Sequence, residues 1–126
     1  MPKILGVDYG TKNIGLAISD DLQKQAFAYD TLRMSAKLIS GITQICADEK
    51  IDKIVIGLPI SLSGNYSAKT EEVVQFIHLL EATTKLMVET EDERLTSVQA
   101  HRLQSGHKID EASAQLILQQ YLDHNN

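Results

Sequence analysis

The chain has 126 residues, of which 43% are hydrophobic and 23% are charged, a balance typical of a globular domain with a real core. This composition excludes a disordered chain, a collagen-like or low-complexity chain and a small disulfide-stabilised fold. Twelve basic and seventeen acidic residues give a formal net charge of -5. The chain therefore has no overall positive field for nucleic acid, and binding to phosphates needs local basic groups or bound cations.

The length predicts a single domain over residues 1–126. The only cysteine, Cys46, lies in an apolar periodic stretch, which is typical of a small core residue in a reducing compartment. The N-terminus shows neither the apolar region nor the cleavage site of a signal peptide. The longest apolar run, residues 54–60, is far shorter than the roughly 20 residues of a membrane span. We therefore expect a cytoplasmic protein without a membrane partner.

The first third of the chain predicts an antiparallel meander. Residues 4–9 are expected to form a strand, residues 10–13 a tight turn and residues 14–19 a second strand, with a third strand at residues 27–32. Large apolar and small side chains alternate along the second strand, which leaves one face open to close approach. The large side chains are Ile14, Leu16 and Ile18, and the small ones are Gly15, Ala17 and Ser19.

After Arg33 the period of the apolar residues changes to that of a helix. The further elements expected are a helix at 38–46, a strand at 53–57, a loop at 61–65, a helix at 73–80, a strand at 86–89 and helices at 97–103 and 110–122. Three strands followed by alternating helices and strands predict an α/β fold. Its mixed five-stranded sheet has an antiparallel meander, then parallel strands, and helices on both faces.

Two aspartates lie where such a sheet places functional groups. Asp8 ends the first strand on the pleat face of Ile4 and Gly6, where a buried carboxylate needs a partner; the alternative is an acid that caps the next turn. Asp110 opens the last helix and shares its buried face with Ala114. The alternative for Asp110 is a first-turn acid that complements the helix dipole.

An acidic run, residues 91–93, follows the fifth expected strand. By alternation Glu91 and Glu93 share one face and Asp92 lies on the other, so only part of the run can face a site. The alternative is an ordinary solvated turn. Arg94, next in the chain, can neutralise one of these acids or contact a phosphate.

Carboxylates from distant parts of the chain can converge at one edge of a mixed sheet, where they repel one another unless they are protonated or bridged by cations. Oxygen ligands select Mg²⁺ or Mn²⁺ over zinc. The four histidines, expected on the surface, show no ligand spacing: His78, His101, His107 and His124. In a two-metal site one ion activates water and the other stabilises the leaving oxygen of a phosphodiester.

The chain resembles the YqgF/RuvX family in four segments that lie in order and span nearly its whole length: GVDYGTKNIGLAISD, IVIGLPISLSGNYS, EDERLTS and KIDEASAQLILQQYLD. The resemblance implies an RNase H-like three-layer α/β/α fold, similar to RuvC-type resolvases. It also implies a nuclease that acts in 5'-end maturation of pre-16S rRNA or on Holliday junctions. A turn like that of the first segment also opens sugar kinases and Hsp70-type ATPases, which need two such domains.

The family's motifs match this sequence at the acidic positions. Its first-strand aspartate matches Asp8, the acid of its DER motif matches Glu93, and the aspartate that opens its last helix matches Asp110. The resemblance implies that these three residues are catalytic and hold Mg²⁺ or Mn²⁺. The residues expected to contact the phosphates of the substrate are Lys12, Ser61, Ser63, Asn65 and Arg94.

Two departures from the family pattern concern nucleic-acid binding. Asn13 stands where the family often has arginine. The segment before the last helix, residues 104–108, is short and nearly neutral, whereas the family usually has a longer segment that is richer in lysine and arginine. These departures keep open a non-catalytic module that binds RNA in ribosome assembly. As partners we expect pre-rRNA or branched DNA, and as assembly a monomer or a homodimer, since symmetric cleavage of a junction requires a two-fold dimer.

Overall fold

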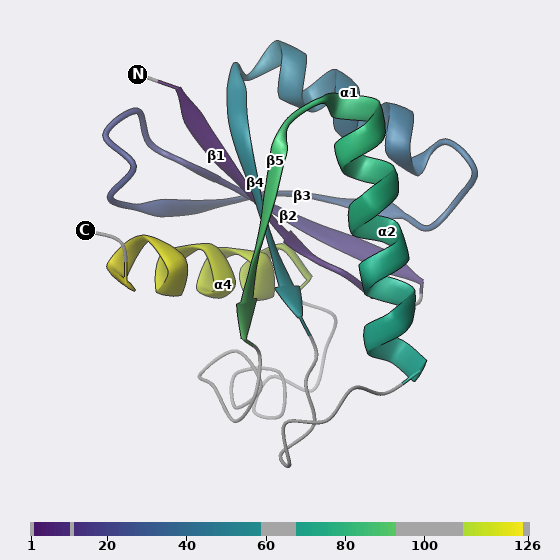
Figure 1. Cartoon of the computed structure of the whole chain (residues 1–126). Coiled ribbons are helices and arrows are strands. Elements are labelled where there is room, and N and C mark those ends of the chain that lie inside the picture. Colours follow the sequence, from purple (N-terminus) through teal and green to yellow (C-terminus); the bar gives the residue numbers. More distant parts are fainter. Residues whose placement is uncertain (1, 11, 59–67, 93–109, 125–126) are drawn as a thin grey trace.

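The computed structural model describes residues 2–10, 12–58, 68–92 and 110–124 (Figure 1). Its strands are β1 (Lys3–Asp8), β2 (Asn13–Ser19), β3 (Ala26–Arg33), β4 (Ile51–Leu58) and β5 (Met87–Asp92). Its helices are α1 (Leu38–Asp48), α2 (Ala68–Thr84) and α4 (Asp110–His124). The loop expected at 61–65 and the helix expected at 97–103 lie outside the described residues.

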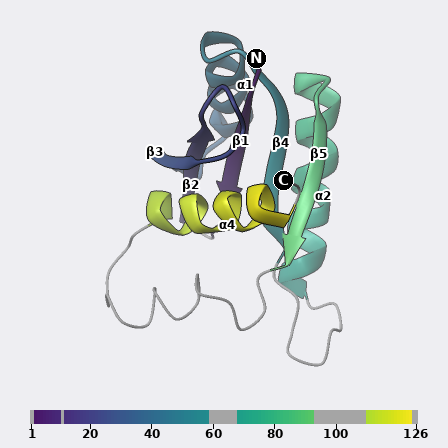
Figure 2. The same cartoon turned by 90° about the vertical axis from the view of Figure 1, so that its left-hand side faces the viewer.

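The five strands form one sheet in the order β3-β2-β1-β4-β5. The pairs β1–β2 and β2–β3 are antiparallel, whereas β1–β4 and β4–β5 are parallel. Helices α1 and α2 cover one face and α4 covers the other (Figures 1 and 2). This arrangement confirms the mixed sheet with helices on both faces. Because β1, β4 and β5 are parallel, their carboxyl ends share one edge of the sheet.

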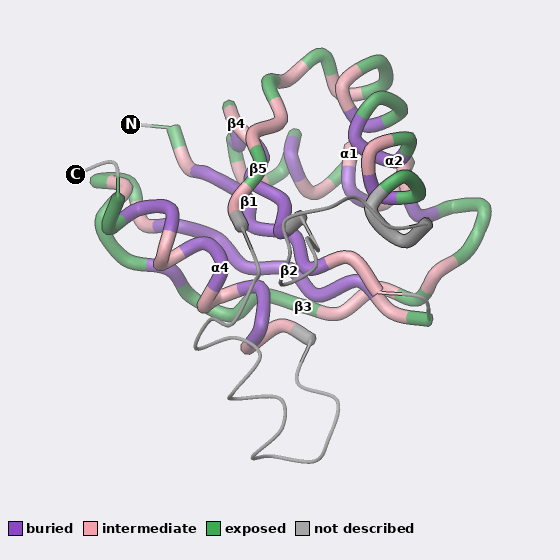
Figure 3. Tube along the Cα trace, turned by 60° about the horizontal axis from the view of Figure 1, so that its bottom comes forward, coloured by how far each residue is buried: buried purple, intermediate pink, exposed green. Residues whose placement is uncertain are grey.

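Two hydrophobic cores follow from the alternation of the strands. Leu5 and Val7 of β1 face α1 and α2, whereas Ile4 faces α4. The β-branched run of β4 is buried on both sides, with Val55 on the α4 side and Ile54 on the other. Figure 3 shows this burial along the central strands and the exposure of most of β3 at the edge. Each apolar face therefore finds a helix layer to cover it.

Helix α4 lies very close to the sheet because small residues face it. A β-carbon added at Gly6 would lie 2.7 Å from Leu118 Cβ and 3.2 Å from the carbonyl oxygen of Ala114. Ala17 of β2 and Ala26 of β3 belong to the same core. The predicted small-residue face is thus confirmed, and it is α4 that approaches it.

Polar contacts hold α4 at both edges of the sheet, which it crosses from β3 to β5 (Figure 2). Near its start, Gln115 Nε2 donates to the carbonyl oxygen of Ala26 over 3.0 Å. Near its end, the Tyr121 hydroxyl donates to Glu89 of β5 and accepts from Lys53 Nζ over 3.1 Å. The helix is therefore tied to both edge strands.

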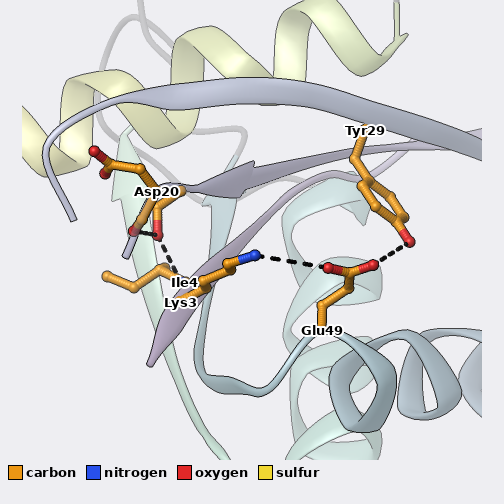
Figure 4. A network of polar contacts seen from close by, with 6 residues as sticks. Lys3, Ile4, Asp20, Tyr29 and Glu49 are labelled. Carbon is orange, nitrogen blue, oxygen red and sulfur yellow. Dashed lines mark hydrogen bonds and ion pairs between the residues drawn. The ribbon is translucent and has the colours of Figure 1, made fainter. Parts of the chain in front are cut away.

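A polar network joins β1, β3 and the end of α1 at the opposite end of β1 from Asp8 (Figure 4). Glu49 lies 3.8 Å from Lys3 Nζ and accepts a hydrogen bond of 3.1 Å from the Tyr29 hydroxyl. Partly exposed ion pairs of this kind contribute about 1 kcal/mol or less.

Cys46 is buried in the core between α1 and the sheet, as predicted. Burial raises the pKa of its thiol from 9.0 to about 11, so the reactive thiolate is scarce at neutral pH. In the described ranges no helix has the length and apolar character needed to cross a membrane.

Candidate active site

Asp8 is a buried carboxylate at the carboxyl end of β1. Only 3% of the residue is exposed, and alternation places it on the α4 face of the sheet, two residues after Gly6. Asp8 takes part in a polar or electrostatic interaction, but its Oδ1 atom is buried and accepts no hydrogen bond from the residues described. A buried ionised oxygen is destabilising unless a cation or a donor compensates its charge.

The first turn of α4 lies over the row of the sheet that contains Asp8. Asp8 pairs with Gly15 of β2, and Gly15 pairs with Thr31 of β3. The Thr31 hydroxyl donates to the carboxylate of Glu111, the second residue of α4. With strands spaced about 4.8 Å apart, Thr31 and Asp8 lie about 10 Å apart in backbone position. The segments that carry Asp8 and Asp110 therefore lie on the same face of the sheet; the side chain of Asp110 lies outside the described residues.

Strand β5 continues through the start of the acidic run instead of ending at Glu89, so the expected strand at 86–89 was too short. Gln120 Nε2 of α4 donates to Glu91 Oε2 over 2.6 Å, and His124 Nδ1 lies 3.1 Å from the same oxygen. These contacts satisfy Glu91 on the α4 face, so an acid here does not break the strand. Glu93 and Arg94 lie outside the described residues.

The remaining site residues predicted from the sequence are only partly described. Lys12 is exposed in the turn after β1, and its carbonyl oxygen accepts a hydrogen bond of 2.8 Å from Met34 N. No three His, Cys, Asp or Glu side chains within the described ranges are grouped to hold a metal. Three predicted phosphate contacts in the loop expected at 61–65 lie outside these ranges: Ser61, Ser63 and Asn65.

The contact between Thr31 and Glu111 was not predicted. It lowers the pKa of Glu111, mainly through the hydrogen bond from the Thr31 hydroxyl. The two residues are 80 positions apart, and no periodic pattern links them. The only local signal is the position of Glu111 next to Asp110. The contact anchors the start of α4 to β3.

Replacing Thr31 with valine removes this anchor while keeping the shape of the side chain. We expect Thr31→Val to lower the free energy of unfolding by about 1 kcal/mol, because the hydrogen bond to a charged acceptor is lost at a partly exposed position. Urea unfolding measures the change. Thr31→Ser keeps the hydroxyl and should retain most of the stability, so equal losses in the two variants would argue against the anchor.

Comparison with known proteins shows to which family the chain belongs. A family model described as "RuvX: Holliday junction resolvase" matches residues 2–124. The chain belongs to the RuvX family. A RuvX relative from Protochlamydia amoebophila, named "Putative pre-16S rRNA nuclease", is 37% identical over 139 aligned residues, which cover 96% of this chain and 93% of the relative. The family resemblance of the four sequence segments is thereby confirmed.

Solved structures show the fold of this RuvX chain. Thermus thermophilus RuvC in complex with a Holliday junction substrate superposes with a TM-score of 0.65 at 10% identity, over 99% of this chain and 96% of that one. The RNase H-like fold expected from the sequence is confirmed. A hexokinase from the same organism matches with a TM-score of 0.51 at 15% identity, over 79% of this chain and 37% of its own. The fold alone thus does not identify the reaction.

Proposed function

We propose that this RuvX-family chain is a metal-dependent nuclease that hydrolyses phosphodiester bonds in structured nucleic acid, with the 5' end of pre-16S rRNA as its substrate. The observation that carries the proposal is Asp8, a buried carboxylate on the face where α4 begins with a second aspartate. The name of the Protochlamydia relative supports ribosomal RNA as the substrate.

The residues present fit a hard divalent cation. Asp8 offers a buried carboxylate oxygen, which Mg²⁺ and Mn²⁺ prefer as a ligand. Asp8, Glu93 and Asp110 would hold the metal ions. When bound, such ions lower the pKa of a water molecule and stabilise the leaving oxygen of a phosphodiester.

The other proposed site residues bind and orient the substrate. Lys12 and Arg94 would supply positive charge to substrate phosphates, because a chain with a net charge of -5 needs local basic groups to bind them. The hydroxyl and amide groups of Ser61, Ser63 and Asn65 donate hydrogen bonds to phosphate oxygens. Contacts of this kind position a nucleic acid without reading its sequence.

Purified protein should cleave an RNA that contains the 5' end of pre-16S rRNA in the presence of Mg²⁺ or Mn²⁺, and EDTA should abolish the cleavage. A four-way DNA junction under the same conditions should be cleaved more slowly. Denaturing gels measure both rates. Faster cleavage of the junction by a dimeric species would favour a DNA resolvase instead. Tight RNA binding without cleavage at any metal concentration would favour the non-catalytic ribosome-assembly module.

A further inference from the structure

Arg33 ends strand β3 at the same edge of the sheet as Asp8. Arg33 pairs with Asn13 of β2. This pair lies two residues beyond the row of Asp8, Gly15 and Thr31, toward the carboxyl ends of β1 and β3. Leu32 packs into the α1–α2 core, so alternation places Arg33 with Thr31 on the α4 face. From strand spacing and rise, the backbones of Arg33 and Asp8 lie on the order of 12 Å apart.

The guanidinium of Arg33 is available for a ligand. Arg33 is exposed, and its side chain makes no hydrogen bond or ion pair with any residue that the structure describes. The nearest acid along its strand, Asp30, instead accepts a hydrogen bond of 2.7 Å from the backbone N–H of Thr31. An unpaired guanidinium offers five donors in a planar fork that matches the oxygens of a phosphate.

Two lysines lie at the same end of the β2–β3 hairpin. The 2.8 Å hydrogen bond from Met34 N to the carbonyl oxygen of Lys12 holds the end of β3 beside the turn that follows Asp8. Lys37 is exposed just before α1, four residues after Arg33. Three basic residues, Lys12, Arg33 and Lys37, thus lie just before β2, at the end of β3 and in the segment between β3 and α1, in a chain whose net charge is -5. Such a local cluster is the kind of group that a negatively charged protein needs to bind phosphates.

We propose that Arg33, assisted by Lys37, binds backbone phosphates of the nucleic-acid strand beside the scissile bond. The inference rests on the proposed nuclease function and adds a substrate-binding surface to it. A strand whose scissile phosphate lies at Asp8 carries its next phosphates past the end of β3, within reach of these long side chains. The contact recognises the phosphodiester backbone and not the base sequence.

The test measures binding without cleavage. Asp8→Asn protein is titrated into a fluorescent RNA with the 5' end of pre-16S rRNA and into a four-way DNA junction, at several salt concentrations in EDTA. Adding Arg33→Gln should weaken binding about tenfold near 0.1 M salt and reduce the slope of log K against log[salt] by about 0.7–0.9. Arg33→Lys keeps the charge and should restore the slope. Lys37→Gln should reduce the slope in the same direction.

Lys24→Gln is the matched control, because Lys24 is an exposed cation at the opposite end of the same hairpin. It should leave affinity and slope unchanged. If the wild-type protein cleaves and the Asp8→Asn protein binds nucleic acid, but Arg33→Gln behaves like Lys24→Gln, this inference alone is overturned. Absence of binding to both nucleic acids at low salt would overturn the proposed function as well. A loss confined to the RNA or to the junction would identify which nucleic acid uses the contact.

Discussion

Asp8→Asn should abolish metal-dependent cleavage and leave the fold intact. The substitution keeps the size of a side chain that is only 3% exposed but removes the charge that a divalent cation requires. Loss of an outer contact of a metal site costs about 10–100-fold in activity, so loss of a direct ligand should cost more than about 100-fold. Without metal, the variant should be at least as stable as the wild type, because a buried charge has been removed.

A second readout separates metal binding from activity. Mg²⁺ or Mn²⁺ should raise the melting temperature of the wild-type protein and have little effect on Asp8→Asn, since only a folded state that binds the ion gains stability. Asp52→Asn is the matched control, because Asp52 is exposed at the opposite end of the neighbouring parallel strand. Equal cleavage by wild type and Asp8→Asn would indicate a contaminating nuclease and support an RNA-binding role alone.

Gly6→Ala should destabilise the protein by about 2–3 kcal/mol, although it adds only one methyl group. The new β-carbon would lie 2.7 Å from Leu118 Cβ and 3.2 Å from a backbone oxygen of α4. Neither atom is the end of a flexible side chain, so the whole helix must move. Because α4 begins at Asp110, cleavage should fall as well. Urea unfolding and the RNA cleavage assay measure the two effects.

Gly41→Ala is the control for Gly6→Ala. Gly41 lies inside α1, and an added β-carbon would have Leu32 Cδ1 at 3.7 Å, an ordinary contact. Alanine there should raise stability by about 0.5–1 kcal/mol, because glycine is unfavourable inside a helix. A Gly6→Ala protein as stable as the wild type would contradict the close approach of α4.

Strict alternation made the centre of the sheet predictable from sequence. The β1–β2 hairpin and the β-branched run of β4 were predicted because each residue's burial follows from its local pattern. The predicted end of β5, at Glu89, was wrong because the fit of the next residues in a strand depends on distant partners and not on the local pattern. Glu91 is compatible with a strand only because Gln120 and His124, about 30 residues later, satisfy it. No periodicity reveals partners at that distance.

In the candidate site, too, the features set by local sequence were predicted and those set by distant contacts were not. The burial of Asp8 and its place on the face of Gly6 follow from its position in an apolar strand, and both are observed. The anchoring of α4 by Thr31 and the exposed Arg33 opposite Asn13 depend on the strand register, which the sequence alone does not determine. The register also places a cation across from the position where the family often has arginine.

The residues that bring α4 down onto the sheet have almost no side chain: Gly6 on β1, Ala17 on β2 and Ala26 on β3. Their smallness sets how far the helix stands from the strand that carries Asp8. In a random mutagenesis screen, inactivating changes should therefore appear at these positions as well as at the acids. Enlarging any of them should move the two aspartate-bearing segments apart without removing any reactive group.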